Sequence, residues 1–301
     1  MSTQTVGPLV SIITITYNRA DLIHRCIESI QKQTYRNYEH IIVDGNSDDN
    51  TEDVIMSYND PHIKYIKLNT KGPQVQMKAG SSAAEGKYVT FLDDDDEYLS
   101  QKLEKQVMLF ESLPEDYGIV YCWMSYYNND NPAKVIRVHA TKLHGFVGDI
   151  TPAEPRVCGT PTLMIRREVF NEFGGTFNDS IGIIMSDWEL AARITQKYKV
   201  EYVPESLVKV YVNHGHRQLN TSVNAEKATR TIKFHNHFLN EFKGVFDRHP
   251  EYRLRHYSNL CYAYASLRDN KKAWHYFKLL QSCHPGLKKN CRLLIKILFN
   301  K

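Results

Sequence analysis

The chain has 301 residues, 42% of them hydrophobic and 24% charged, which is typical of a globular protein with a sizeable core. A formal net charge of +4 is too small to indicate nucleic acid as a partner, and no apolar run reaches the roughly 18 residues of a membrane-spanning helix. Six scattered cysteines without a C-x-x-C pair argue against a zinc site, and the N-terminus lacks the features of a secretory signal. These features predict a cytoplasmic protein.

Strands and helices alternate along roughly the first 120 residues. The β-branched run at 9–16 predicts a strand that is covered on both faces, and the apolar spacing within 19–33 predicts an amphipathic helix. Further strands are predicted at 40–43, 63–68, 88–92 and 119–123, and further helices at 51–58, 74–85 and 102–111. This alternation indicates βαβ units and therefore an α/β fold with a mostly parallel central sheet flanked by helices.

The second half of the chain is less regular. A short strand at 135–138 lies among Asn, Pro and Gly residues, which indicates loops around a site. Helices at 168–173 and 187–197 and a late strand at 209–213 are predicted next. From Asn224 onward the sequence is helical with little β-branching. We therefore expect a first domain at 1–224 and a C-terminal helical region at 225–301.

Four consecutive aspartates, Asp93–Asp96, directly follow the strand predicted at 88–92. Because each like charge raises the cost of ionising the next, a divalent cation bound to their oxygens would relieve the repulsion. In open α/β sheets, ligands bind beyond the carboxyl ends of the strands, and Asp44 ends a neighbouring predicted strand. The sequence thus predicts a cation and ligand site at this edge, against the alternative of a solvated surface turn.

Five segments, in order and spacing, resemble glycosyltransferase family 2, whose inverting enzymes have the GT-A fold. The matching segments are 10–18, 43–51, 86–96, 159–167 and 186–190. The resemblance implies that residues 1–224 form a nucleotide-sugar-binding catalytic domain. This domain would move a sugar from a nucleotide-diphosphate donor, most simply a UDP-sugar, to a carbohydrate or lipid-linked acceptor hydroxyl. It also implies a role in polysaccharide or lipopolysaccharide synthesis and a need for Mn²⁺ or Mg²⁺.

The resemblance assigns roles to single residues. It implies base binding by Tyr17 and Asp44, a backbone contact at Ile15, ribose or diphosphate contact by Asp93 or Asp94, metal binding by Asp95 and base catalysis by Asp187. Asp187 begins a predicted helix, and the helix dipole favours an ionised carboxylate, as a catalytic base requires. The alternative is that Asp187 only caps this helix. Two departures from the usual pattern are Gly45, where a second aspartate is common, and Ser186, where glutamate is common.

Four basic or histidine side chains are further candidates. Lys71 is expected to reach a donor phosphate or to remain solvated. After the late strand, His214 or His216 would complete the metal shell and Arg217 would hold the diphosphate, with a surface loop as the alternative.

A basic amphipathic segment at 286–301 predicts either contact with the inner membrane surface, which suits a lipid-linked acceptor, or packing on the protein. Two other functions compete with sugar transfer. A sugar nucleotidyltransferase usually has a glycine-rich loop after the first strand, whereas 17–21 contains no glycine. A non-catalytic scaffold would use the helical tail to recruit partners and would not need Asp95 or Asp187.

Overall fold

The computed structural model describes residues 7–157, 159–178, 181, 185–212 and 224–283. The chain divides into two compact units. The first, here called the sheet unit, comprises Met1–Val147, Arg156–Phe177 and Leu190–His216, and the second, the helical unit, comprises Gly148–Pro155, Asn178–Glu189 and Arg217–Lys301. The helical unit thus includes two short segments from the first 224 residues, and the simple division at 224/225 stays a prediction.

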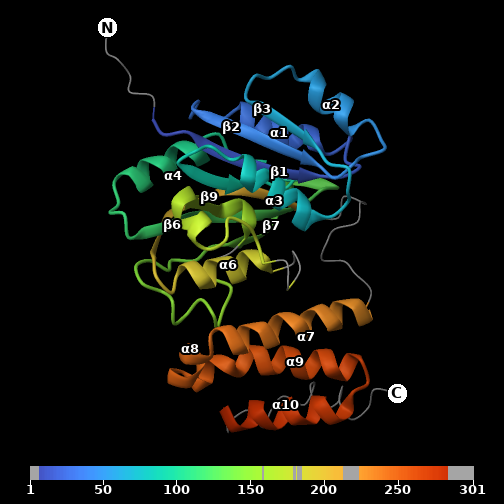
Figure 1. Ribbon diagram of the computed structural model, residues 1–301, viewed down its shortest axis with the longest axis vertical. Coiled ribbons are helices and arrows are strands. Elements are labelled where there is room, and N and C mark those ends of the chain that lie inside the picture. The colour runs from blue at the N-terminus through green and yellow to red at the C-terminus, as the bar shows by residue number, and fades with distance from the viewer. Residues whose placement is uncertain (1–6, 158, 179–180, 182–184, 213–223, 284–301) are drawn as a thin grey trace. The chain divides into compact units, whose positions relative to one another are not determined.

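One sheet forms the centre of the sheet unit (Figure 1). Within the described residues its strand order is β3-β2-β1-β4-β8-β6-β9-β5, and β7 pairs with β6. Parallel pairing joins β1 to β2 and β4, β2 to β3, and β6 to β9, whereas β8, β5 and β7 pair antiparallel with their neighbours. The strands are β1 (Val10–Thr16), β2 (Tyr38–Asp44), β3 (Ile63–Lys67), β4 (Tyr88–Phe91), β5 (Glu97–Tyr98), β6 (Tyr117–Asn128), β7 (Asn131–His139), β8 (Leu163–Arg166) and β9 (Lys199–Val212).

Helices cover both faces of this sheet (Figure 1). Ile12 packs in one hydrophobic core with Cys26 of α1 and Leu103 of α4. Ile13 points to the other face, because side chains alternate along a strand, and lies under α3. There a Cβ on Gly80 would lie only 2.6 Å from the Ile13 side chain, so glycine permits the close approach of α3. The helices of this part of the chain are α1 (Ile23–Gln31), α2 (Thr51–Ser57), α3 (Pro73–Ala83), α4 (Lys102–Glu111), η1 (Thr160–Thr162), α5 (Arg167–Glu172) and α6 (Ser186–Ile194).

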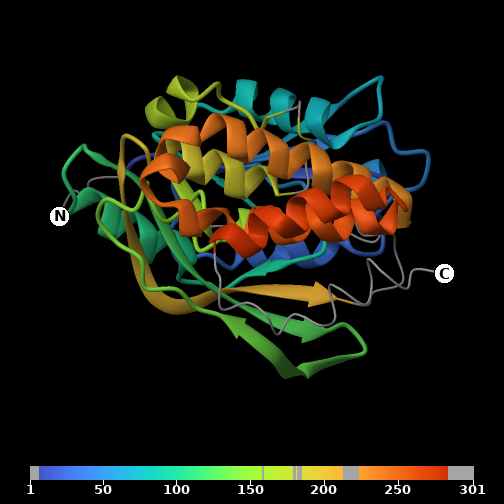
Figure 2. The same cartoon turned by 90° about the horizontal axis from the view of Figure 1, so that it is seen from below.

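The later strands differ most from the sequence-based prediction. The strand predicted at 209–213 is the end of the long β9, which pairs with β6 over most of its length. Polar and partly exposed residues interrupt β9, so its periodicity is weak. The strand at 135–138 extends into β7, which is exposed along nearly its whole length at the margin of the sheet (Figure 2). β8 and β5 were not predicted, because runs of four and two residues are too short to show a period.

In the helical unit, α9 packs against both α7 and α10 (Figure 1). Among the described residues, no helix is both long and apolar enough to cross a membrane. The basic segment at 286–301 lies outside the described residues. The helices are α7 (Asn224–Glu241), α8 (Lys243–Arg248), η2 (Pro250–Arg253), α9 (Leu254–Ser266) and α10 (Asn270–Cys283).

A histidine pair lies in the aromatic core of this unit. His235 Nδ1 and His256 Nδ1 are 2.9 Å apart, and His256 Nε2 lies 2.8 Å from the carbonyl oxygen of Pro152. Since a carbonyl only accepts, His256 donates from Nε2, and its Nδ1 accepts from His235. Burial lowers the pKa of His235 to about 3 and that of His256 to about 4, so both rings are neutral near pH 7.

Candidate active site

Three of the predicted segments meet at one edge of the sheet. Thr16 and Asp44 are register partners at the carboxyl ends of β1 and β2. β4 runs parallel to β1, and the Leu92 amide donates to the carbonyl of Ile13, so Asp93–Asp96 emerge at the same edge. The hydroxyl of Thr16 donates to Asp94 Oδ2 over 2.7 Å. The order of the parallel strands therefore places the predicted base-binding and metal-binding segments side by side.

The four aspartates of this loop have two different environments. Asp94 and Asp96 are buried, and Asp96 Oδ1 accepts a 2.9 Å hydrogen bond from the Tyr211 amide. Asp93 is exposed, and the Asp95 side chain is 15% exposed. Burial, followed by the nearby Asp95 charge, raises the pKa of Asp94 to about 7, and the same causes raise that of Asp96 well above its usual value. Asp94 and Asp96 anchor the loop, and Asp93 and Asp95 are the accessible pair.

Two arginines that sequence reasoning missed contact Asp95. Arg19 Nη1 lies 3.5 Å from Asp95 Oδ2, and Arg25 Nη1 donates to the Asp95 carbonyl over 2.9 Å. Arg25 also donates to Asn129 Oδ1 over 2.8 Å and lies 3.8 Å from the centroid of the Tyr211 ring. Arg19 is close to the matched Tyr17, which was a usable signal. Nothing in the sequence around Arg25 distinguishes it from a surface residue of an amphipathic helix.

Asp44 is fully buried at the end of β2. Its Oδ1 accepts from the Ser47 amide over 2.8 Å and from the Ser47 hydroxyl over 2.7 Å. Its Oδ2 accepts from the Tyr65 hydroxyl of β3 over 2.8 Å. A carboxylate offers about four lone pairs, so Oδ2 retains acceptor capacity beside Tyr65. Tyr65 was not predicted, because β3 reads only as a strand with one covered face.

Tyr17 and Lys71 lie together, although 54 positions separate them in the sequence. The Lys71 ammonium donates to the Tyr17 hydroxyl and lies 4.5 Å from the centroid of its ring. It also lies 3.9 Å from Asp48 Oδ2. Ile15 is half-buried in β1, two residues before Tyr17. The side chains of Tyr17 and Lys71, both predicted to contact the donor, are thus on one exposed surface beside Asp48.

The residues present fit a divalent cation only if the ligand completes its coordination. Within the described residues no group of three or more His, Cys, Asp or Glu side chains is arranged to hold a metal. However, Mg²⁺ and similar hard ions are commonly held by one or two carboxylates together with substrate phosphates. Burial is the main cause of the raised pKa values of Asp94 and Asp96, and the charge of Asp95, which a bound cation would offset, raises them further. The donor set suits an ion that arrives with a diphosphate.

Asp187 lies in the first turn of α6 and is half-buried. Two residues later the fully buried Glu189 accepts from Asn178 Nδ2 over 3.1 Å, and its Oε1 lies 3.1 Å from His237 Nε2. Asn178, Asp187, Glu189 and His237 all belong to the helical unit and are described within it. His214, His216 and Arg217, the other predicted ligands, lie outside the described residues.

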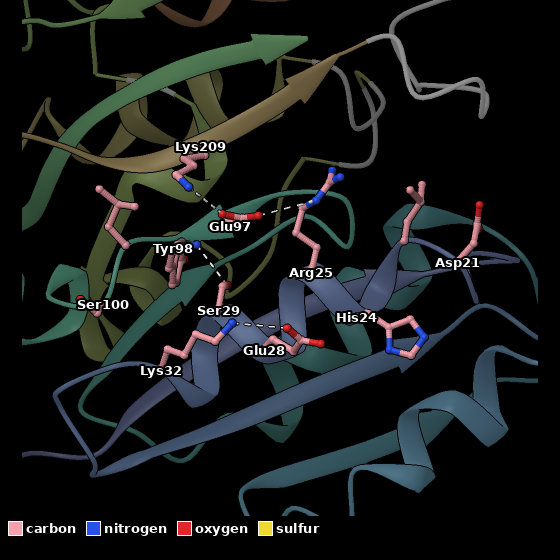
Figure 3. A pocket seen from close by; sticks show the side chains of 12 residues that line it. Asp21, His24, Arg25, Glu28, Ser29, Lys32, Glu97, Tyr98, Ser100 and Lys209 are labelled. Carbon is pink, nitrogen blue, oxygen red and sulfur yellow. Dashed lines mark hydrogen bonds and ion pairs between the residues drawn. The ribbon is translucent and has the colours of Figure 1, made fainter. Parts of the chain in front are cut away.

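A cavity of about 530 Å³ lies between α1, β5 and β9 (Figure 3). Glu97 bridges two cations at its rim, since its carboxylate lies 3.7 Å from Arg25 Nε and accepts from Lys209 Nζ over 3.1 Å. Of the predicted donor and metal residues that the structure describes, none lines this cavity. Its connection to the candidate site is indirect, through the contact of Arg25 with the Asp95 carbonyl.

Comparison with known proteins assigns the family. The family described as Glycosyl transferase family 2 matches residues 11–174, more than half of the chain. The chain is 40% identical over 118 residues to a protein of Campylobacter jejuni named GalNAc(5)-diNAcBac-PP-undecaprenol beta-1,3-glucosyltransferase, covering 38% of this chain and 37% of that protein. It spans about a third of the length of the curated relatives that it matches.

Solved structures agree with the fold. TarS from S. aureus, in complex with UDP-GlcNAc, has a TM-score of 0.63 at 15% identity, with 92% of each chain covered. The mannosyltransferase PcManGT from Pyrobaculum calidifontis, in complex with GDP-Man and Mn²⁺, has a TM-score of 0.60 at 20% identity, covering 97% of this chain and 86% of that one. The expected GT-A fold is therefore confirmed. With this fold and the match over residues 11–174, the chain belongs to glycosyltransferase family 2.

Proposed function

We propose that this protein transfers a sugar from a nucleoside-diphosphate donor, a UDP-sugar in the first instance, to the hydroxyl of a carbohydrate or lipid-linked acceptor, with inversion at the anomeric carbon. The observation that carries the proposal is the acidic loop Asp93–Asp96, which meets the ends of β1 and β2 at one sheet edge. The exposed Asp93 and the partly exposed Asp95, next to the buried Asp94 and Asp96, form a site suited to a cation and its diphosphate.

Each residue has a distinct task in this proposal. Tyr17 stacks on the base, and Asp44 accepts a hydrogen bond from it. Lys71 and Arg217 contact the diphosphate, and Asp93 or Asp94 contacts the ribose or diphosphate. Asp95 holds Mn²⁺ or Mg²⁺, with His214 or His216 as a further ligand. When bound, the cation stabilises the charge that develops on the departing nucleoside diphosphate.

Asp187 is the proposed general base. The acceptor oxygen forms a bond to the anomeric carbon while the bond from that carbon to the diphosphate oxygen breaks. The acceptor proton passes to Asp187, because a hydroxyl is a weak nucleophile at neutral pH. Asp187 lies in the first turn of α6 and is half-buried. A single displacement of this kind inverts the anomeric configuration.

The names of similar proteins support the substrate classes. TarS is described with UDP-GlcNAc, and PcManGT with GDP-Man and Mn²⁺. The name of the Campylobacter jejuni protein includes an undecaprenol-linked acceptor. We therefore place this chain in polysaccharide or lipopolysaccharide synthesis on the cytoplasmic side of the membrane, with 286–301 as the segment that contacts the membrane surface.

The test is calorimetric titration of the protein with UDP, GDP and dTDP, in the presence of Mn²⁺ and again with EDTA. We expect one diphosphate to bind with a Kd in the micromolar range in Mn²⁺ and at least about tenfold more weakly in EDTA. Binding that ignores the metal would contradict the role of Asp95. A folded protein that binds none of the three would overturn the proposal and favour the scaffold function.

A further inference from the structure

Gln76 joins the ends of the two strands that carry the proposed base site. It lies on α3, the helix that Figure 1 shows in front of the sheet, and its side chain is buried, with 3% exposure. Its side-chain amide donates to the carbonyl of Thr16 over 2.7 Å and to the carbonyl of Val43 over 3.0 Å. These carbonyls belong to the residues directly before Tyr17 and Asp44. One amide group therefore fixes the backbone from which both base-binding residues extend.

Gly45 provides the space that this amide occupies. A Cβ on Gly45 would lie 2.9 Å from Gln76 Cδ and 3.0 Å from both its terminal atoms, so the Gln76 side chain would have to move out of its two hydrogen bonds. The Gly45 amide also donates to the Thr16 carbonyl over 2.9 Å, so that carbonyl accepts two hydrogen bonds. The departure from the family pattern at position 45, glycine in place of aspartate, thus has a physical reason in the Gln76 side chain.

Thr16 extends the connection to the acidic loop. Its carbonyl accepts from Gln76, and its hydroxyl donates to Asp94, the buried neighbour of Asp95. α3 lies close enough for these bonds because Gly80, one turn after Gln76, permits its approach to β1 and β2. Displacement of the Gln76 amide would loosen both halves of the site through a single residue.

We propose that Gln76 is a positioning residue of the donor site, that its amide holds Tyr17, Asp44 and, through Thr16, Asp94 in their binding geometry, and that Gly45 is required because of it. This inference rests on the proposed function, since it concerns the same nucleoside-diphosphate site. Gln76 itself need not touch the ligand.

The chain offers a matched control for this role. Gln106 of α4 is also fully buried, and its amide also donates to two backbone carbonyls, those of Val120 over 3.0 Å and Thr162 over 2.9 Å. Neither carbonyl adjoins a residue of the proposed site. Gln76→Ala and Gln106→Ala therefore remove the same kind of bond in two places, and both should lower the melting temperature.

The experiment is titration of each variant with UDP and Mn²⁺, or with whichever diphosphate the wild type prefers, well below its melting temperature. We expect Gln76→Ala to weaken binding about tenfold and Gln106→Ala by less than about twofold. Gln76→Glu, which keeps the shape but presents acceptors to two carbonyls, should weaken binding at least as much as Gln76→Ala.

A double-mutant cycle with Gly45 completes the test. Gly45→Ala should weaken binding about as much as Gln76→Ala, because its methyl group displaces the amide. In the Gln76→Ala background the same change should have almost no further effect, since the space is then empty. Additive losses would overturn the inference, and so would Gln76→Ala that binds like the wild type at a lowered melting temperature. If the wild type binds no nucleoside diphosphate, the proposed function fails and the inference fails with it.

Discussion

The acidic loop of the sheet unit and the histidine pair of the helical unit both bury ionisable groups, but the consequences differ. In the loop, Asp94 and Asp96 are like-charged neighbours whose pKa values are raised by burial and by Asp95. In the pair, each ring is neutral and hydrogen-bonded to the other. A shifted pKa is therefore a poor indicator of function by itself. Repulsion among like charges at the carboxyl end of parallel strands is the better one.

The largest expected effect comes from the loop. Asp95→Ala should abolish metal-dependent binding of the nucleoside diphosphate and lower transfer at least about a hundredfold, because a bound cation supplies several kcal/mol of charge stabilisation. The melting temperature should stay close to that of the wild type. Asp53→Ala, which changes an exposed aspartate of α2, is the control and should leave both properties unchanged. If nucleoside diphosphate binding by Asp95→Ala still depended on the metal, the acidic loop would not be the metal site. Its buried acids would then be structural, like the histidine pair.

The histidine pair should affect stability instead of binding. Unfolded histidines titrate near pH 6.5, whereas burial lowers the pKa of His235 to about 3 and of His256 to about 4. Between about pH 6.5 and 4 the unfolded chain binds more protons than the folded chain does. The stability that comes from keeping the two rings neutral is therefore complete above pH 6.5 and is lost as the pH falls. His256→Gln can still accept from His235 and donate to Pro152. Between pH 7 and pH 5 the wild type should lose about 2 kcal/mol more of its free energy of unfolding than His256→Gln does. Urea unfolding at the two pH values measures this difference.

Lys102 is a buried ionisable group of the sheet unit that, like the histidine pair, should affect stability and not ligand binding. It is fully buried, donates to Thr90 Oγ1 over 2.8 Å and lies 3.9 Å from the centroid of the Tyr98 ring. Burial lowers its pKa to about 7, so the cost of burying the cation is complete below pH 7 and disappears as pH rises toward 10.5. Lys102→Met should raise the free energy of unfolding by about 1–2 kcal/mol at pH 6 and by less at pH 9. Destabilisation at both pH values would show that the ring and hydroxyl contacts outweigh desolvation.

The smallest effect is expected at Arg25, which donates a hydrogen bond to the backbone carbonyl of Asp95 in the acidic loop. Arg25→Lys keeps the charge but cannot donate to the Asp95 carbonyl and Asn129 at once while lying flat on Tyr211. We expect a threefold to tenfold weaker dependence of diphosphate binding on Mn²⁺, read from titrations at several metal concentrations. Lys32→Ala, an exposed change directly after the same helix, should not alter this dependence. An unchanged metal dependence in Arg25→Lys would make Arg25 a structural residue only.

Much of the fold followed from period and order alone. β1 and α4 lie within one residue of their predicted bounds, because a covered strand and an amphipathic helix each leave a clear pattern. β8 and β5 left no pattern, and β9 was recognised only at its end. Their pairing is set by tertiary contacts, which a local window does not contain.

The site divides in the same way. Acid clusters and strand ends pointed to Asp44 and Asp95, since their chemistry is visible in the sequence. Residues that hold others in place, such as Gln76 and Arg25, carry no chemical signal of their own. Only the register of strands and the packing of α3 and α1 show what they do. The metal, catalytic and donor roles of the predicted residues stay predictions until the titrations are done.

The hydrogen bond from the Thr16 hydroxyl to Asp94 has a thermodynamic consequence. If base and cation bind on either side of this bond as proposed, it couples two binding equilibria. Coupling free energy is reciprocal, so the factor by which Mn²⁺ tightens the nucleotide must equal the factor by which the nucleotide tightens Mn²⁺. Thr16→Val, which keeps the shape and removes the donor, should reduce both factors equally. When either the nucleoside diphosphate or the cation dissociates, the protein would then bind the other more weakly. Release of the product would thus be coupled to release of the metal.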